Sequence, residues 1–164
     1  MSLEATRRKL LDASLAHVAF DGWSEAAIAE GARDLGLSPA EALNAFPGGP
    51  RELLRAFHED IDRQMLARLE AADLESLRVR DRVALAVRTR LELLEPQAEA
   101  VRRGLAYLAL PHNAPLASRL VWRTADAIWY AAGDTATDYN YYTKRSLLCG
   151  VYSATLLYWL NDRS

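Results

Sequence analysis

Apolar residues recur at helical spacing along almost the whole chain, and this limits the fold more than any other feature. The clearest run has residues three or four positions apart on one stripe: Leu53, Leu54, Phe57, Ile61, Met65 and Leu69. Such spacing places side chains on one side of an α-helix, whereas half-buried strands alternate with a period of two. That alternation is nearly absent. The sequence therefore predicts an all-α fold.

Caps and breakers divide this pattern into eight expected helices. Ser24 and Ser38 are favourable N-caps, Gly36 is a favourable C-terminal stop, and Pro96 interrupts a helical pattern. The expected helices cover approximately residues 3–20, 24–35, 38–46, 51–74, 81–94, 97–110, 116–132 and 138–161.

Length and composition favour one soluble globular protein. The chain has 164 residues, of which 51% are hydrophobic and 26% charged, with a net charge of −2. A single cysteine, Cys149, excludes an internal disulfide. The most apolar stretch, 147–160, is too short to span a bilayer, and the first residues do not resemble a secretory signal. A cytoplasmic location follows as the expectation.

The first fifty residues resemble the helix-turn-helix module of the TetR-type repressor fold. A long helix followed by two short ones is typical of this arrangement. The residues that carry the resemblance are 8–14, 22–24, 28–29, 36–38, 46–47 and 52–54. We expect this module to span residues 1–50, and a helical bundle for ligand binding and dimerisation to span 51–164, the two packed as one unit.

The charge of this module argues against DNA binding. Residues 22–50 contain one basic residue, Arg33, against four carboxylates, which gives a net charge of −3. The expected recognition helix, 39–46, has no lysine or arginine. Phosphate contacts require cations, and base readout uses arginine, asparagine or glutamine. We expect a retained fold that does not bind DNA.

Aromatic residues are concentrated in 121–145, which holds two of the four tryptophans and four of the seven tyrosines. Trp122 and Trp129 lie seven positions apart on similar helix faces, and either a core or an interface role is open for them. The tyrosines of 139–142 point in several directions beside Lys144 and Arg145, which suits a partner interface.

The final helix is apolar nearly all round, so it is central, lies in an oligomer interface or lines a cavity. Three histidines, His17, His58 and His112, stand far apart, and none forms a metal-binding pair at helical spacing. We therefore expect no metal, no cofactor and no catalytic residues. Arg78, Arg80 and Arg82 are expected on a solvated face or in contact with an acidic partner.

The C-terminal third resembles the coenzyme Q (ubiquinone) biosynthesis accessory family, lipid-binding proteins with a TetR-like fold. The matching segments are Trp-Tyr-Ala-Ala-Gly-Asp at 129–134, Thr-Asp-Tyr-Asn-Tyr-Tyr-Thr-Lys-Arg at 137–145, and Val-Tyr at 151–152. This chain has tyrosine at 139 and 141 where the family has phenylalanine and tryptophan. The family often has a further amphipathic helix that touches the membrane, and here that helix is either absent or truncated.

The resemblance implies a non-enzymatic accessory protein, usually a homodimer. It would bind an isoprenoid quinone precursor or a phospholipid in an apolar cavity and present it to a di-iron hydroxylase. The surface patch for the hydroxylase would comprise Asp138, Tyr139, Asn140, Tyr141, Tyr142 and Arg145. Candidate residues for the lipid cavity are Leu91, Leu94, Leu105, Leu108, Trp122, Ile128 and Leu156.

The expected site of action is the cytoplasm, with peripheral contact at the inner membrane, or the mitochondrial matrix in a eukaryote. From residue 77 onward the chain has 12 basic and 8 acidic residues, which favours an anionic membrane surface for this half. Two alternatives stay open: a TetR-type transcriptional repressor with a small-molecule effector, and a purely structural dimer.

Overall fold

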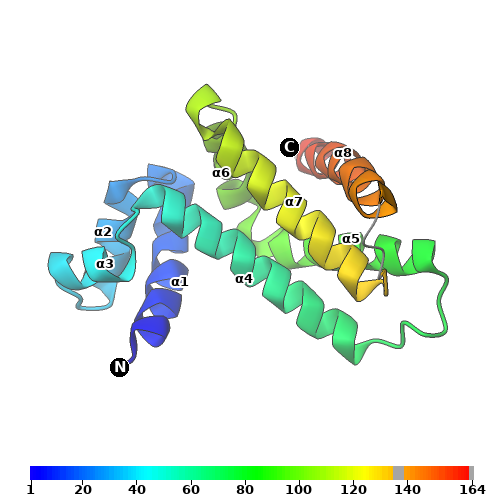
Figure 1. Cartoon of the computed structure of the whole chain (residues 1–164). Coiled ribbons are helices and arrows are strands. Elements are labelled where there is room, and N and C mark those ends of the chain that lie inside the picture. Colours follow the sequence, from blue (N-terminus) through cyan, green and yellow to red (C-terminus); the bar gives the residue numbers. More distant parts are fainter. Residues whose placement is uncertain (135–138, 163–164) are drawn as a thin grey trace. The chain divides into compact units, whose positions relative to one another are not determined.

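A computed structural model describes residues 1–134 and 139–162 and confirms the all-α class (Figure 1). Within these residues there are eight α-helices, two 3-10 turns and no strand. The helices are α1 (Leu3–Asp21), α2 (Glu25–Asp34), α3 (Pro39–Ala45), α4 (Pro50–Ala71), α5 (Val79–Leu94), α6 (Ala98–Leu108), α7 (Ala114–Ala131) and α8 (Tyr139–Asp162).

Serine side chains begin the first three helices. Ser24 Oγ accepts a hydrogen bond from the Ala27 N–H, and Ser38 Oγ accepts one from the Glu41 N–H, which confirms both expected caps. Ser2 caps α1 in the same way. Gly36 ends the turn between α2 and α3 with φ +71°, a conformation that only glycine adopts without strain. Residue 138, where the last helix was expected to begin, lies outside the described residues.

Helix boundaries differ from the expected ones by a few residues. The long helix α4 ends at Ala71 rather than at residue 74, and α5 begins at Val79 rather than at residue 81. Pro96 interrupts the chain as expected: a 3-10 turn, Glu95–Gln97, separates α5 from α6. Proline cannot donate the backbone hydrogen bond that a continuous helix requires there.

The chain divides into two compact units. The first unit contains residues 1–59 and 97–111, and the second contains 60–96 and 112–164. The helix α6 therefore belongs with α1–α3, although it follows them by some fifty residues of sequence. The expected division at residue 50 and the likeness to TetR repressors both stay predictions.

Trp23 attaches α6 to the rest of the first unit. Its indole Nε1–H donates to the Ala100 carbonyl at 2.9 Å, and its ring lies 5.5 Å from that of Phe57. On α6, Gly104 permits this close packing, because a Cβ there would lie 3.2 Å from the indole nitrogen. Around this tryptophan, α1 packs against α2, α3 and α6.

In the second unit, α7 packs against both α5 and α8. Aliphatic side chains such as Leu94, Ile128 and Leu156 form its core. The core also contains polar groups, of which Arg90 and Arg145 are the largest: their side chains are only 1% and 3% exposed. Two candidate functional sites, a cluster of aromatic side chains and a groove between α5 and α8, lie beside these buried arginines.

Candidate functional site

Three aromatic side chains from α7 and α8 form a surface cluster in the second unit, here called the aromatic cluster: Trp122, Tyr141 and Tyr142. The two tyrosine rings meet edge to face with centroids 5.0 Å apart, and the Trp122 ring lies 6.3 Å from Tyr141 and 6.2 Å from Tyr142. Tyr142 is 61% exposed. Large, rigid rings with a polar hydroxyl are typical anchors of protein interfaces.

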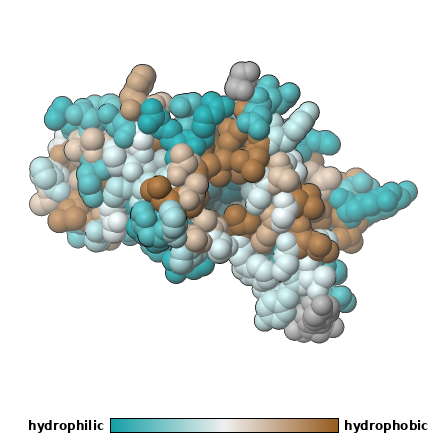
Figure 2. All heavy atoms as spheres, turned by 90° about the horizontal axis from the view of Figure 1, so that it is seen from above, coloured by the Kyte–Doolittle hydropathy of each residue, from teal (hydrophilic) through white to brown (hydrophobic). Residues whose placement is uncertain are grey.

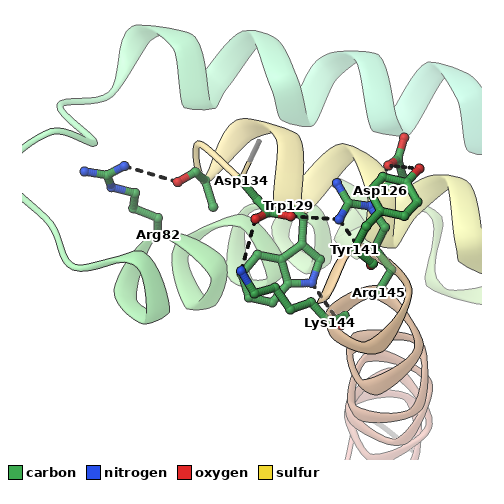
Figure 3. A network of polar contacts seen from close by, with 8 residues as sticks. Arg82, Asp126, Trp129, Asp134, Tyr141, Lys144 and Arg145 are labelled. Atoms are coloured by element: carbon green, nitrogen blue, oxygen red, sulfur yellow. Dashed lines mark hydrogen bonds and ion pairs between the residues drawn. The ribbon is translucent and has the colours of Figure 1, made fainter. Parts of the chain in front are cut away.

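An ionic network centred on the buried Arg145 contacts Tyr141 of this cluster (Figure 3). Arg145 Nε donates to Asp126 Oδ1 at 2.7 Å, and its Nη1 donates to Asp134 Oδ2 at 2.8 Å. The guanidinium carbon lies 3.7 Å from the centre of the Tyr141 ring. Tyr141 in turn donates its hydroxyl to Asp126 at 3.1 Å. One arginine of α8 therefore contacts both Asp126 of α7 and Asp134, which follows the end of α7.

Lys144 and Trp129 extend the same network. The Lys144 ammonium lies 3.1 Å from Asp134 Oδ1, and the Trp129 indole donates to the Lys144 carbonyl at 3.1 Å. Burial by itself would lower the pKa of Arg145, but its hydrogen bonds to Asp126 and Asp134 raise that pKa above the usual value. Arg145 is therefore permanently charged, and Asp134, at 6% exposed, lies between two cations.

The structure divides the expected hydroxylase patch into residues of different kinds. Asn140 and Tyr142 are exposed and Tyr141 is half-buried, so these three can reach a partner. Arg145 is buried and positions Tyr141 instead of presenting its charge. Asp138 and the side chain of Tyr139 lie outside the described residues.

Sequence reasoning missed Asp126 and Asp134 as partners of Arg145. The sequence contained one signal for this pairing. Asp126 lies between Trp122 and Trp129 on one helix face, and a carboxylate among apolar side chains needs a cation as its partner. It also misplaced Arg82, expected on a solvated face or against an acidic partner. Arg82 is half-buried and donates to the carbonyls of Leu77 and Ala132 at 3.0 and 3.1 Å. It therefore satisfies the C-terminal end of α7.

The expected lipid residues belong to both units. Leu105 and Leu108 lie on α6 in the first unit, and the other five lie in the second. Leu94, Ile128 and Leu156 are fully packed core residues. Trp122 belongs to the aromatic cluster.

Leu91 does line a hollow. It lies in a groove of about 430 Å³ between α5 and α8, entirely within the second unit. The apolar lining consists of side chains one or two turns apart on each helix: Val83, Ala84, Val87 and Leu91 from α5, and Leu148 and Val151 from α8. Arg80 and Arg88 stand at its edge. A groove with an apolar floor and flanking guanidinium groups suits a ligand with a hydrocarbon tail and an anionic head.

Part of α8 presents apolar side chains to solvent next to this groove. Leu147 and Val151 are 66% and 61% exposed, and Leu157 and Tyr158 are also open. On the face of the molecule drawn in Figure 2, hydrophobic side chains (brown) gather at the surface. Exposed apolar surface of this kind marks an interaction site more often than a chance arrangement.

A second buried network lies beneath the groove. Arg90 Nε donates to Asp62 Oδ1 at 2.9 Å, and Arg90 Nη1 donates to the Tyr152 hydroxyl at 2.6 Å. The Thr124 hydroxyl donates to the same carboxylate at 3.0 Å. Side chains from α4, α5, α7 and α8 therefore meet at one charged pair. Nothing in the spacing of the sequence indicated it, because each partner comes from a different helix.

Two findings concern what the described residues lack. They contain no group of three or more histidine, cysteine or acidic side chains placed to hold a metal ion. No helix among them is long and apolar enough to cross a bilayer.

Comparison with known proteins identifies relatives along nearly the whole chain. The COQ9 family model matches residues 114–164, the part that holds α7, α8 and the aromatic cluster. "Ubiquinone biosynthesis protein COQ9, mitochondrial" of Homo sapiens is 36% identical over 170 residues, and that of Bos taurus is 37% identical over 174. Each alignment covers 99% of this chain and 53% of the relative.

A more distant relative, "Probable ubiquinone biosynthesis protein coq9, mitochondrial" of Dictyostelium discoideum, is 28% identical over 162 residues. The chain spans about half the length of the curated relatives that it matches. The aligned residues of this chain include those that form the aromatic cluster and the α5–α8 groove. The chain is therefore similar to COQ9 proteins over about half of their length, and its residues 114–164 match the COQ9 family model.

Proposed function

We propose that this protein is a non-enzymatic accessory of ubiquinone biosynthesis that binds an isoprenoid quinone precursor or a phospholipid and presents it to a di-iron hydroxylase. The names of its relatives support the pathway. The observation that carries lipid binding is the α5–α8 groove, with its apolar lining and flanking Arg80 and Arg88. The relatives give no support to the repressor alternative.

The apolar lining of the α5–α8 groove favours a ligand with a hydrocarbon tail over a compact polar substrate. Each CH₂ group removed from water contributes about 0.8 kcal/mol, so a long prenyl or acyl chain gains affinity without specific polar contacts. Arginine at the rim suits a phosphate or another anionic head, because its guanidinium matches such oxygens in a fork. The groove volume of about 430 Å³ lies within the range of ordinary ligand sites.

Lipid content tests this assignment directly. The purified protein is extracted with organic solvent and the extract is analysed by mass spectrometry, alongside native mass spectrometry of the intact protein. We expect a lipid with a long hydrocarbon chain. Val151→Lys places a charge in the groove and should lower lipid content at least fivefold. Leu157→Lys, on the same helix and similarly exposed but outside the groove lining, should retain it.

Two results would contradict the assignment. The wild-type protein is incubated with vesicles of phosphatidylglycerol and a prenylated quinone. If it then carries no lipid, lipid binding itself is excluded. Equal loss in both lysine variants would place the lipid elsewhere on α8.

The aromatic cluster is the proposed contact for the hydroxylase. Tyr142 is the better residue to change, because its side chain is exposed, whereas Tyr141 is tied to Asp126 and Arg145. Tyr142→Lys should reduce capture of the purified hydroxylase more than tenfold in a pull-down while lipid content stays unchanged. Tyr158→Lys, an exposed tyrosine of α8 outside the cluster, is the control. Undiminished capture by Tyr142→Lys would remove the cluster from the interface.

A homodimer and contact with a membrane surface are further parts of the proposal. The exposed apolar side chains of α8 support a dimer face, and the basic excess after residue 77 supports an anionic membrane. Sedimentation velocity at several protein concentrations tests the first, and flotation with anionic against neutral vesicles tests the second.

A further inference from the structure

A second hollow lies in the first unit, away in sequence from the α5–α8 groove and the aromatic cluster. It is a groove of about 450 Å³ between the two short helices α2 and α3. Its floor is formed by buried side chains, Ile28, Ala32 and Phe46, and its wall includes Leu43, which is 64% exposed. An apolar side chain this exposed beside an apolar hollow presents apolar surface to solvent.

The segment that forms this groove has a net negative charge, although the lining itself holds one acidic and one basic side chain. Glu25 and Arg33 both line it, but Arg33 pairs with Glu30, whose Oε1 lies 3.0 Å from Arg33 Nη1. Glu25 is exposed and makes no hydrogen bond or ion pair with another residue among 1–134 and 139–162. The segment 22–50 as a whole carries a net charge of −3. A phosphate backbone or an anionic lipid surface would be repelled here.

We propose that the α2–α3 groove is a docking site for a basic amphipathic helix of a partner protein. Amphipathic helices bind such grooves through apolar residues at positions i, i+3, i+4 and i+7. The apolar stripe would fill the floor against Ile28 and Phe46 and contact Leu43. Lysine or arginine beside the stripe would pair with Glu25, which has no side-chain partner in the part of the chain that the structure describes. The proposal is independent of lipid binding and of the aromatic cluster.

Binding to a defined probe tests the proposal. The probe is a synthetic 16-residue peptide with leucine at i, i+3, i+4, i+7 and i+8 and lysine at the flanking positions, added to the isotopically labelled full chain. We expect chemical-shift changes confined to α2, α3 and the turn between them. The lysine peptide should bind at least tenfold more tightly than the same peptide with glutamate in place of lysine, and the preference should weaken at high salt.

Matched variants separate the groove from general charge effects. Leu43→Lys should weaken binding of the lysine peptide at least tenfold, and Glu25→Lys should weaken it severalfold. Phe20→Lys changes another exposed apolar residue, and Glu4→Lys changes a first-turn acid of α1 as Glu25 is a first-turn acid of α2. Both controls should bind as wild type. Circular dichroism confirms that each variant stays helical.

Several outcomes would overturn the proposal. Shift changes on α8, unaltered binding by Leu43→Lys, or equal affinity for the glutamate peptide would each show that the groove does not select a basic helix. Shift changes in α2 and α3 that depend on protein concentration alone would assign the groove to a second copy of this chain. Binding of a 20-base-pair DNA duplex at the same residues would restore a nucleic-acid role.

Discussion

The interiors of the two units are built differently. In the first unit, Ser14 is the one polar side chain among the buried residues that the structure describes, and the rest of that core is aliphatic or aromatic. In the second unit two arginines are buried together with Thr89, Asn113 and Thr124. At the same time α8 exposes Leu147, Val151 and Leu157. The first unit also exposes apolar side chains, among them Phe20 and Leu43, so the two interiors differ in their buried polar groups and not in how well apolar character predicts burial.

This contrast indicates what the buried charges accomplish. Apolar side chains surround α8, so hydrophobicity alone does not determine which face of the helix turns inward. The buried face carries Arg145, Leu148, Tyr152 and Leu156. Two of these four make the charged contacts, with Asp126 and Asp134 or with Arg90. These polar contacts can all be made at only one rotation of α8 about its axis. We infer that they determine which face of α8 is buried.

The largest effect is expected from breaking the Arg90–Asp62 pair. Arg90→Met leaves Asp62, which is 13% exposed, without its cation and the Tyr152 hydroxyl without its donor. Removal of one partner from a buried ion pair costs about 3–5 kcal/mol. Urea-induced unfolding followed by circular dichroism measures the change. The double variant Arg90→Met/Asp62→Leu should recover much of the loss, and failure to recover any would argue that the charges themselves stabilise the fold.

A smaller loss is expected at Arg145. In Arg145→Met, Asp126 can recover water because it is 45% exposed, and Asp134 retains Lys144. The loss of charge-assisted hydrogen bonds should therefore cost about 2–3 kcal/mol, below the cost at Arg90. Arg145→Lys should restore only part of it, because one ammonium cannot reach both carboxylates in the fork geometry of arginine. Equal stability of the methionine and wild-type proteins would show that the network does not hold α8.

Much of the fold could be predicted from local rules, because those rules act within one helix. Ser24, Ser38 and Pro96 have the effects expected of caps and breakers, and the apolar stripe of α4 is buried as its spacing predicts. The contact partners of Arg145 and Arg90 could not be predicted in this way. Each network joins residues from different helices, and only the packing of those helices brings them together.

The candidate sites show the same limit. The high content of tryptophan and tyrosine in residues 121–145 was visible in the sequence, and this segment does contain the aromatic cluster. The lipid residues were chosen by apolarity, and apolarity does not distinguish a core residue such as Ile128, which is 0% exposed, from a groove residue such as Leu91. Prediction of a cavity requires the distance between two helices, here α5 and α8.

High pH should weaken the second unit through Tyr152. Burial raises the pKa of this phenol above its usual value of about 10, more than the adjacent Arg90 lowers it. The folded state then keeps a proton that the unfolded state loses. Stability is therefore complete below pH ~10 and falls as pH rises through the folded pKa. Unfolding free energies between pH 8 and 11.5 should decline less in Tyr152→Phe than in wild type. An identical decline in the two proteins would mean that Tyr152 does not titrate.

The smallest effect is expected from the exposed pair Arg33–Glu30 of the first unit, which completes the comparison between the units. Its side chains are 74% and 37% exposed, so water solvates both charges in the folded and unfolded states. A double-mutant cycle with Arg33→Ala and Glu30→Ala should give a coupling of about 0.2–0.5 kcal/mol that disappears in high salt. The corresponding cycle at Arg90 and Asp62 should give a larger coupling that salt hardly changes, because ions cannot enter that site. Similar couplings with similar salt dependence would show that burial does not govern the strength of these two ion pairs.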